Sequence, residues 1–185
     1  MIDRLLVAPG LDVDEGQRPV NLRGLVGASG VRSAGRGRSI RPAAPGGRAG
    51  PGGTVSACVW DYDAGMRMIR IFWDEVVALD PSLAAKDQRN MKLVRQGQLG
   101  ELWRSAGLVD VREEPLTIEQ SFASFDDYWQ PFLERTGASG ALVDAMAPEA
   151  RQRLEARVRG RVVGDRADGP FTLEARAWCV RGRVG

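Results

Sequence analysis

The sequence predicts an α/β domain over residues 51–185, preceded by an irregular Gly/Arg/Pro-rich segment over residues 1–50. Two observations predict this division. All twelve Phe, Trp and Tyr residues lie at or after Trp60, whereas residues 1–53 hold twelve Gly and five Pro. After that break, stretches with strand-like composition alternate with stretches of helical spacing, as they do in α/β domains.

The N-terminal segment has too few large apolar side chains to offset the conformational entropy that folding would cost. We therefore expect Gly27–Gly50 to be poorly ordered. Over residues 1–53, eight Arg and four acidic residues give a local charge of +4, against +2 for the whole chain. Two origins stay open for the segment: an Arg/Gly-rich tail that belongs to the protein, or out-of-frame translation of a GC-rich gene.

The composition excludes several kinds of chemistry. The chain has no histidine, so Ser-His-Asp and Cys-His catalytic systems and His-based zinc sites are absent. Cys58 and Cys179 lie in apolar stretches, and we expect them to be buried free thiols of a cytoplasmic protein. No apolar run approaches the roughly 18 residues of a membrane span, and no signal-peptide core opens the chain, so no membrane partner is expected.

The first half of the domain begins with a strand. A Pro-Gly-Gly turn leads into Thr54–Trp60, whose apolar run is typical of a strand buried on both faces. Helical spacing over Arg67–Asp80 predicts a helix that ends before Pro81. A second helix is expected over Gln98–Leu108, with Gly107 as its C-terminal cap.

The second half mixes two long strands with helices. Val109–Phe122 alternates as a long strand, and the proline within it indicates an edge position or a bulge. Ser124 is expected to cap a helix with two aspartates in its first turn. A further helical stretch runs over Ala141–Arg161, interrupted at a proline, and Gly169–Val184 alternates as a closing strand.

The order and spacing of these pieces resemble the C-terminal half of a class I S-adenosylmethionine-dependent methyltransferase, in its small-molecule branch. The resemblance rests on the Pro-Gly-Gly turn before a strand, on "LWRSAGL" at a helix end, and on "LTIEQSFASFDDYWQPFL". It implies strands five to seven of a Rossmann-like methyltransferase sheet with flanking helices. It also implies that a final antiparallel strand, Phe171–Val180, inserts between strands five and six, with Cys58 and Cys179 on neighbouring strands.

The resemblance implies a transferase that uses S-adenosyl-L-methionine to methylate a small-molecule substrate. The family holds this cofactor on a Gly-rich loop, and Leu5–Gly16, Gly27–Gly30 and Gly35–Ser39 lack the strand–loop–helix pattern of such a loop. We therefore assign no cofactor-binding residue and expect impaired cofactor binding. The alternative function is a non-catalytic half-domain that pairs with another chain, or self-associates, through exposed sheet edges.

Two stretches supply candidate substrate-binding residues. Trp60, Asp61 and Tyr62 follow the first strand at its carboxyl end, the edge where open α/β sheets bind ligands. The two aromatics would wall a pocket and Asp61 would accept a proton or orient a hydroxyl; the alternative is a polar loop with one packed aromatic. Phe125 and Trp129 share a helical face, which is either a lid over an apolar substrate or a packing face against the sheet.

The last candidate feature is the arginine-rich stretch Arg151–Arg161, which holds five arginines and one acidic residue. We expect a solvated helix face with i,i+4 pairing. No aromatic residue interleaves with the arginines, so a nucleic-acid partner is not expected, and no metal site is assigned.

Overall fold

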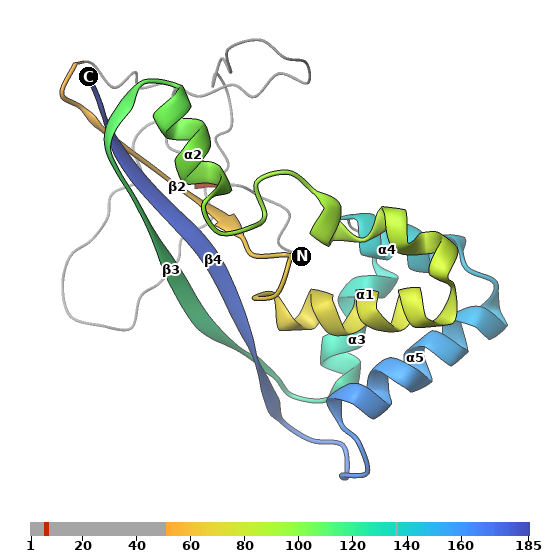
Figure 1. The fold of residues 1–185 in the computed structure, drawn as a ribbon. Helices are drawn as coiled ribbons and strands as arrows, with labels where there is room; N and C mark the ends of the chain where they lie inside the picture. Colours follow the sequence, from red (N-terminus) through yellow and green to blue (C-terminus); the bar gives the residue numbers. More distant parts are fainter. Residues whose placement is uncertain (1–5, 8–50, 136) are drawn as a thin grey trace. The chain divides into compact units, whose positions relative to one another are not determined.

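The computed structural model describes residues 6–7, 51–135 and 137–185 (Figure 1). The predictions for residues 1–50, including their irregular structure and their glycine-containing stretches, lie outside the described residues except at Leu6–Val7. The described residues fall into two compact units. The first unit contains Trp60–Gln96 and Pro115–Ala177, and the second contains Gly97–Glu114, Trp178–Gly185 and the described residues up to Val59.

Four strands form one sheet in the order β1-β2-β4-β3 (Figure 1). Their bounds are Leu6–Val7 for β1, Thr54–Trp60 for β2, Leu108–Phe122 for β3 and Phe171–Val184 for β4. The three long strands lie where the sequence predicts them, and the C-terminal strand lies between the other two. The fold of the described residues is therefore mixed α/β.

The pairing of β4 with both neighbours is antiparallel. On the β2 side, the N–H of Val184 donates to the Gly53 carbonyl at 2.9 Å, and the N–H of Asp61 donates to the Arg176 carbonyl at 2.9 Å. On the β3 side, the rings of Phe122 and Phe171 stack at 5.2 Å, so the end of one strand meets the start of the other. Because β2 and β3 are each antiparallel to β4, they run in the same direction as each other.

The prediction that β2 is buried on both faces is wrong. Val55, Ala57 and Val59 are buried, but Thr54 and Ser56, on the opposite face, are exposed. Side chains alternate between the faces of a strand, and only one face of β2 is covered. Thr54 and Ser56 are small side chains that are compatible with a strand, so the composition of the run did not show that these two positions point outward.

The helices also follow the sequence pattern. The structure has α1 over Arg67–Leu79, α2 over Gln98–Ser105, α3 over Phe125–Leu133, α4 over Gly137–Ala145 and α5 over Pro148–Val162. Two short 3-10 helices, Pro81–Lys86 and Gln88–Asn90, follow α1. Gly107 has φ +85° and ends α2, and the Ser124 side chain accepts the N–H of Asp127 at the start of α3, as predicted.

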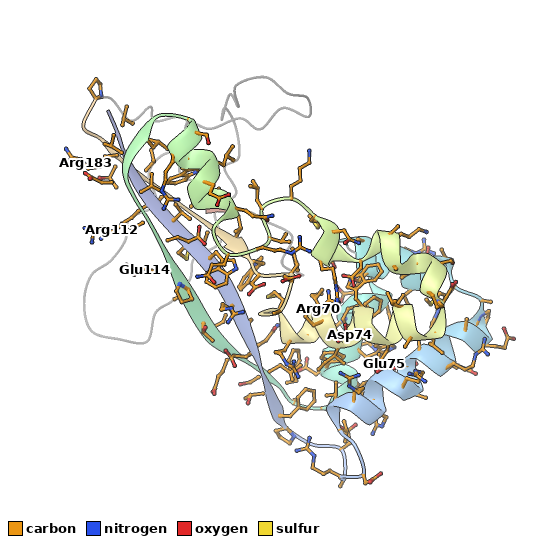
Figure 2. The ribbon with its side chains drawn as sticks, viewed as in Figure 1. Arg70, Asp74, Glu75, Arg112, Glu114 and Arg183 are labelled. Carbon is orange, nitrogen blue, oxygen red and sulfur yellow. A yellow bond between two sulfur atoms is a disulfide. The ribbon has the colours of Figure 1, made fainter. Side chains whose placement is uncertain are left out.

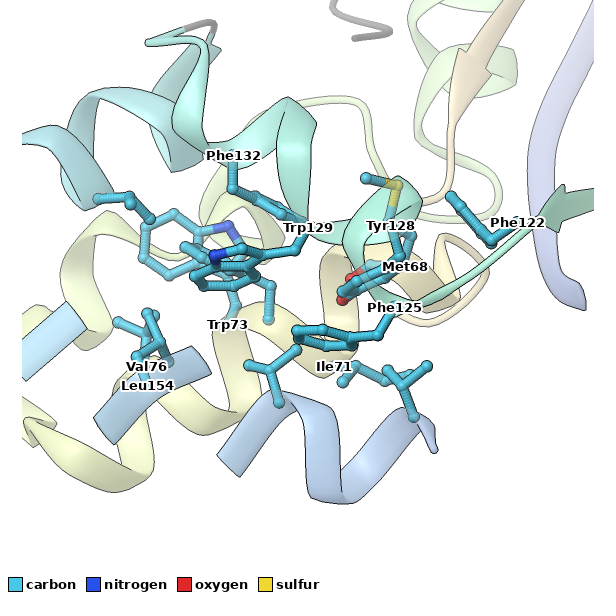
Figure 3. Close-up of a cluster of buried hydrophobic side chains, with 14 of the residues drawn as sticks. Met68, Ile71, Trp73, Val76, Phe122, Phe125, Tyr128, Trp129, Phe132 and Leu154 are labelled. Atoms are coloured by element: carbon cyan, nitrogen blue, oxygen red, sulfur yellow. The ribbon is translucent and has the colours of Figure 1, made fainter. Parts of the chain in front are cut away.

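The first unit has an aromatic core built on α1, α3 and α5 (Figure 3). The rings of Phe72 and Phe132 stack at 4.5 Å, and Phe72 meets Trp73 edge to face at 5.6 Å. Leu154 and Val158 of α5 are fully buried against them. Spacing of three and four residues along each helix brings these side chains to one face, so burial of that face fixes the helices of this unit together.

Candidate functional site

The carboxyl end of β2 is closed by a turn that Asp61 organises. The Asp61 residue is 2% exposed. Its Oδ1 accepts the main-chain N–H groups of Asp63 and Ala64 at 3.1 and 3.0 Å, the pattern of an Asx turn. Its Oδ2 accepts Nε and Nη2 of Arg176 at 2.8 and 2.6 Å. Both carboxylate oxygens are thus engaged, and Asp61 fastens the turn to β4.

Gly65 allows this turn to lie directly against Arg176. A Cβ atom at Gly65 would lie 2.6 Å from the Arg176 Cβ and 2.8 Å from the Asp61 Oδ2. The backbone also pairs there, since the N–H of Arg176 donates to the Gly65 carbonyl at 3.2 Å. Neither Gly65 nor Arg176 was predicted from the sequence to belong to the site. A glycine four positions after a turn-forming aspartate was the available signal for Gly65, but nothing local connects Arg176 with it.

Trp60 and Tyr62 lie on either side of Asp61 and pack into a small cluster. Tyr62 is buried with Met66, Val94 and Ala175, and Trp60 is half-buried against them. This arrangement places the three predicted residues together at the end of β2. Their role in holding a substrate stays a prediction.

Phe125 and Trp129 lie elsewhere, in the aromatic core of the first unit (Figure 3). Their rings stack at 6.0 Å, and Trp129 also lies 6.4 Å from Phe72 of α1. Both side chains are buried, which fits the packing alternative, and their ring contacts are with aromatic residues of α1 and α3. Within the described residues, the Trp129 Nε1 has no hydrogen-bond partner. The two candidate stretches therefore belong to separate clusters.

Tyr128, between these two aromatics, is also part of the core. Its hydroxyl donates to the Met68 carbonyl at 2.9 Å, which ties α3 to α1. Burial raises the pKa of Tyr128 above its usual range, so the phenol stays protonated. Tyr128 is a structural donor here rather than a proton acceptor.

A buried ion network on α1 was not predicted (Figure 2). Arg70 binds Asp87 through two bonds, Nη1–Oδ1 at 2.7 Å and Nη2–Oδ2 at 2.9 Å, and each side chain is 4% exposed. Arg70 also donates to the Tyr62 carbonyl at 3.2 Å and to Asp74 at 3.1 Å. The network connects α1 with the chain before the second 3-10 helix and with the end of β2.

The pKa values of the network follow from its bonding. Burial disfavours the charged form of Arg70, but its hydrogen bonds with Asp87 and Asp74 outweigh this and raise the pKa of Arg70 above its usual value. Burial would likewise raise the pKa of Asp87, yet the bonds from Arg70 and the Arg89 N–H lower it below its usual value. Both groups are therefore charged at neutral pH, which suits a bracing role and not proton transfer.

The arginines of α5 do not form a fully solvated face. Arg157 and Arg161 reach Glu75 of α1 at 2.6 and 2.9 Å, and Glu75 is buried (Figure 2). Arg159 binds Asp168 at 3.0 Å and lies 5.0 Å above the Phe125 ring. The expected i,i+4 pairing is thus replaced by pairing with another helix. Arg153 is exposed, as predicted for the helix face.

The buried carboxylate at the end of β2 does not fit the S-adenosylmethionine site that the resemblance implies. The family's cofactor site needs a backbone cradle of glycines and a carboxylate free to accept the ribose hydroxyls. At the end of β2, the buried carboxylate of Asp61 is already used by Arg176 and the turn. Asp61 is therefore not available as that carboxylate.

Across the described residues, no cluster of acidic and cysteine side chains could hold a metal ion. Within the same part of the chain, no helix combines the length and apolar character needed to cross a membrane. Comparison of the chain with models of protein families and with curated proteins found no match.

Proposed function

We propose that residues 51–185 form the acceptor-side half of an S-adenosylmethionine-dependent methyltransferase domain that acts on a small molecule. The observation that carries this proposal is the strand order β2-β4-β3. Two strands run in the same direction, and the last strand of the chain lies between them in the opposite direction. The resemblance implies this order for the fifth, seventh and sixth strands of a Rossmann-like methyltransferase sheet.

The end of β2 is the place where the proposal puts the methyl acceptor. Ligands of open α/β sheets bind beyond the carboxyl ends of parallel strands, and Trp60 lies half-buried at that end. Asp61, Gly65 and Arg176 hold the turn behind Trp60 in one geometry. The cofactor would supply the methyl group, and alignment of the acceptor can provide most of the catalysis without a histidine.

Calorimetric titration of the full chain with S-adenosylhomocysteine tests the proposal. The sequence of residues 1–50 has no strand–loop–helix pattern of a Gly-rich loop, and the Asp61 carboxylate is already engaged, so the proposal expects weak cofactor binding. We expect saturable heat, weaker than micromolar, with S-adenosylhomocysteine and none with NAD, which shares only the adenosine. Absence of heat at millimolar ligand would contradict methyl transfer by this chain.

A second measurement tests the acceptor site. Transfer of a labelled methyl group to a panel of small phenols, amines and carboxylates should fall at least tenfold in Trp60→Ala. Thr54→Ala, at the exposed far end of the same strand, is the matched control and should retain full transfer. Equal activity of both variants would remove Trp60 from the site.

The sheet edge favours a second candidate, a non-catalytic pairing module. Among the described residues, β1 meets β2 at two positions, with Leu6 opposite Cys58 and Val7 opposite Ala57. Within the described residues, β1 lies opposite only two of the seven residues of β2, and a strand edge without a partner can bind another strand. Concentration-dependent sedimentation without cofactor binding would favour this candidate over the enzyme.

A further inference from the structure

The two cysteines are joined in a disulfide, so the prediction of free thiols is wrong. Cys58 lies on β2 and Cys179 on β4, neighbouring strands as the resemblance implies. The two cysteines are 121 residues apart in the sequence but lie directly opposite each other on the paired strands β2 and β4. No described cysteine is free.

The register of the sheet explains the bond. Val184 donates its N–H to the Gly53 carbonyl, so these two residues form a hydrogen-bonded pair of the ladder. Five residues along each strand from that pair, Cys58 lies opposite Cys179. An odd number of steps leads to a non-hydrogen-bonded pair, where the backbones are closest, and the two Cα atoms are 4.1 Å apart. The register therefore places Cys58 and Cys179 directly opposite each other, with both side chains on the same face of the sheet.

The pair lies on the open face of the strands. A Cβ atom at Gly182 would point at Trp103 of α2, so even-numbered positions of this part of β4 face α2. Cys179 faces the other way, on the side of the exposed Arg181 and Arg183, because side chains alternate along the strand. Both cysteines are half-buried and not sealed in the core. A small thiol or disulfide can therefore reach them, which the exchange reaction requires.

We propose that Cys58 and Cys179 form a reversible exchange site for small disulfides such as glutathione disulfide. In the oxidising direction, one cysteine thiolate attacks glutathione disulfide, forms a mixed disulfide and releases one glutathione thiolate. The second cysteine thiolate then attacks the protein sulfur and releases the other glutathione. The two cysteines lose two electrons and two protons, and glutathione disulfide becomes two molecules of glutathione.

Closing this bond has a defined effect on the sheet. It links β2 to β4 across 121 residues of chain, which removes many conformations of the unfolded state. A loop of that order raises the folding equilibrium constant by roughly 10³-fold in the chain-entropy account. The proposal does not depend on methyl transfer.

The experiment equilibrates the full chain in buffers of varied glutathione to glutathione disulfide ratio, then blocks free thiols with an alkylating reagent. Mass spectrometry should show both cysteines moving together between two thiols and one disulfide within that range. Urea unfolding should then give a higher midpoint for the oxidised form. Cys58→Ser should instead accumulate a glutathione adduct on Cys179, and Ser56→Ala, on the same face of β2, should titrate as the wild type.

Three results would overturn the proposal. The cysteines could stay as thiols in glutathione disulfide, or stay as a disulfide in excess glutathione, which would make the bond purely structural. Alternatively, the wild type could carry stable glutathione adducts, which would show that the sulfur atoms do not meet. The wild-type titration decides among these even if the serine variant fails to fold.

Discussion

At the scale of single residues, Asp61 has two possible roles, in ligand binding or in holding the turn after β2. Its place after a strand suggests ligand chemistry, but both of its oxygens are used by the turn and by Arg176. Asp63, two residues later, has a different environment, because its ion pair with Arg95 is about half exposed on both sides. The two aspartates therefore provide a matched comparison.

We expect Asp61→Ala to lower the free energy of unfolding by about 3 kcal/mol, because it removes a buried charge partner and two turn bonds. Asp63→Ala should cost about 0.5 kcal/mol, since exposed ion pairs contribute little. Urea unfolding of both variants measures the difference. Similar losses would show that Asp61 is not the brace of the turn.

At the scale of elements, α1 organises the first unit. It packs on α5 through Val76 and Leu154 and binds the same helix through Glu75. The helix was predictable from apolar spacing, and its C-terminal end from Pro81. Its ion partners were not, because Arg157 and Arg161 follow Glu75 by more than 80 residues.

A double substitution on α5 tests the link between the two helices. Arg157→Ala with Arg161→Ala leaves Glu75 buried without its two partners, and we expect a loss of about 3 kcal/mol. Adding Glu75→Gln should restore most of the lost stability, because the buried carboxylate charge without a partner is replaced by a neutral amide. Arg153→Ala, exposed on the same helix, should change stability by less than about 0.5 kcal/mol.

Unfolding measurements on the three α5 variants distinguish pairing from helix propensity. Alanine favours helix formation, so a propensity effect would stabilise all of them. If the triple variant is no more stable than the double variant, Glu75 does not depend on these arginines.

At the scale of the whole molecule, both proposed functions depend on the strand order of the sheet. Its order puts the C-terminal strand between two strands that come earlier in the chain. That order supports the methyltransferase proposal, and the positions of β2 that have no described partner on the β1 side support the pairing candidate. The odd-numbered residues of β2 bond to β4, so the N–H of Ser56 points to the other edge.

The pairing candidate therefore predicts a specific effect of proline. Ser56→Pro removes the outward N–H of β2 without removing a bond to β4, and it should shift self-association toward monomer by at least tenfold. Ser56→Ala keeps the N–H and should associate as the wild type. Analytical ultracentrifugation over a concentration series measures both, and unchanged association of the proline variant would exclude this edge.

The sequence alone determined the three long strands, the positions of the helices and the capping of α2 and α3. These depend on local features, namely apolar periodicity, turn residues and side-chain caps, which act over a few residues. Trp60, Asp61 and Tyr62 could be placed at a strand end for the same reason.

Only the tertiary structure decided which residues meet across long separations. It showed the disulfide between Cys58 and Cys179 and the ion pair between Arg176 and Asp61. It also showed that two arginines of α5 pair with the buried Glu75. Such contacts depend on strand register and helix packing, and a shift of one residue in either would change every partner. Local patterns carry no record of that register, so the folded chain alone shows that the cysteines pair and that Asp61 is already engaged.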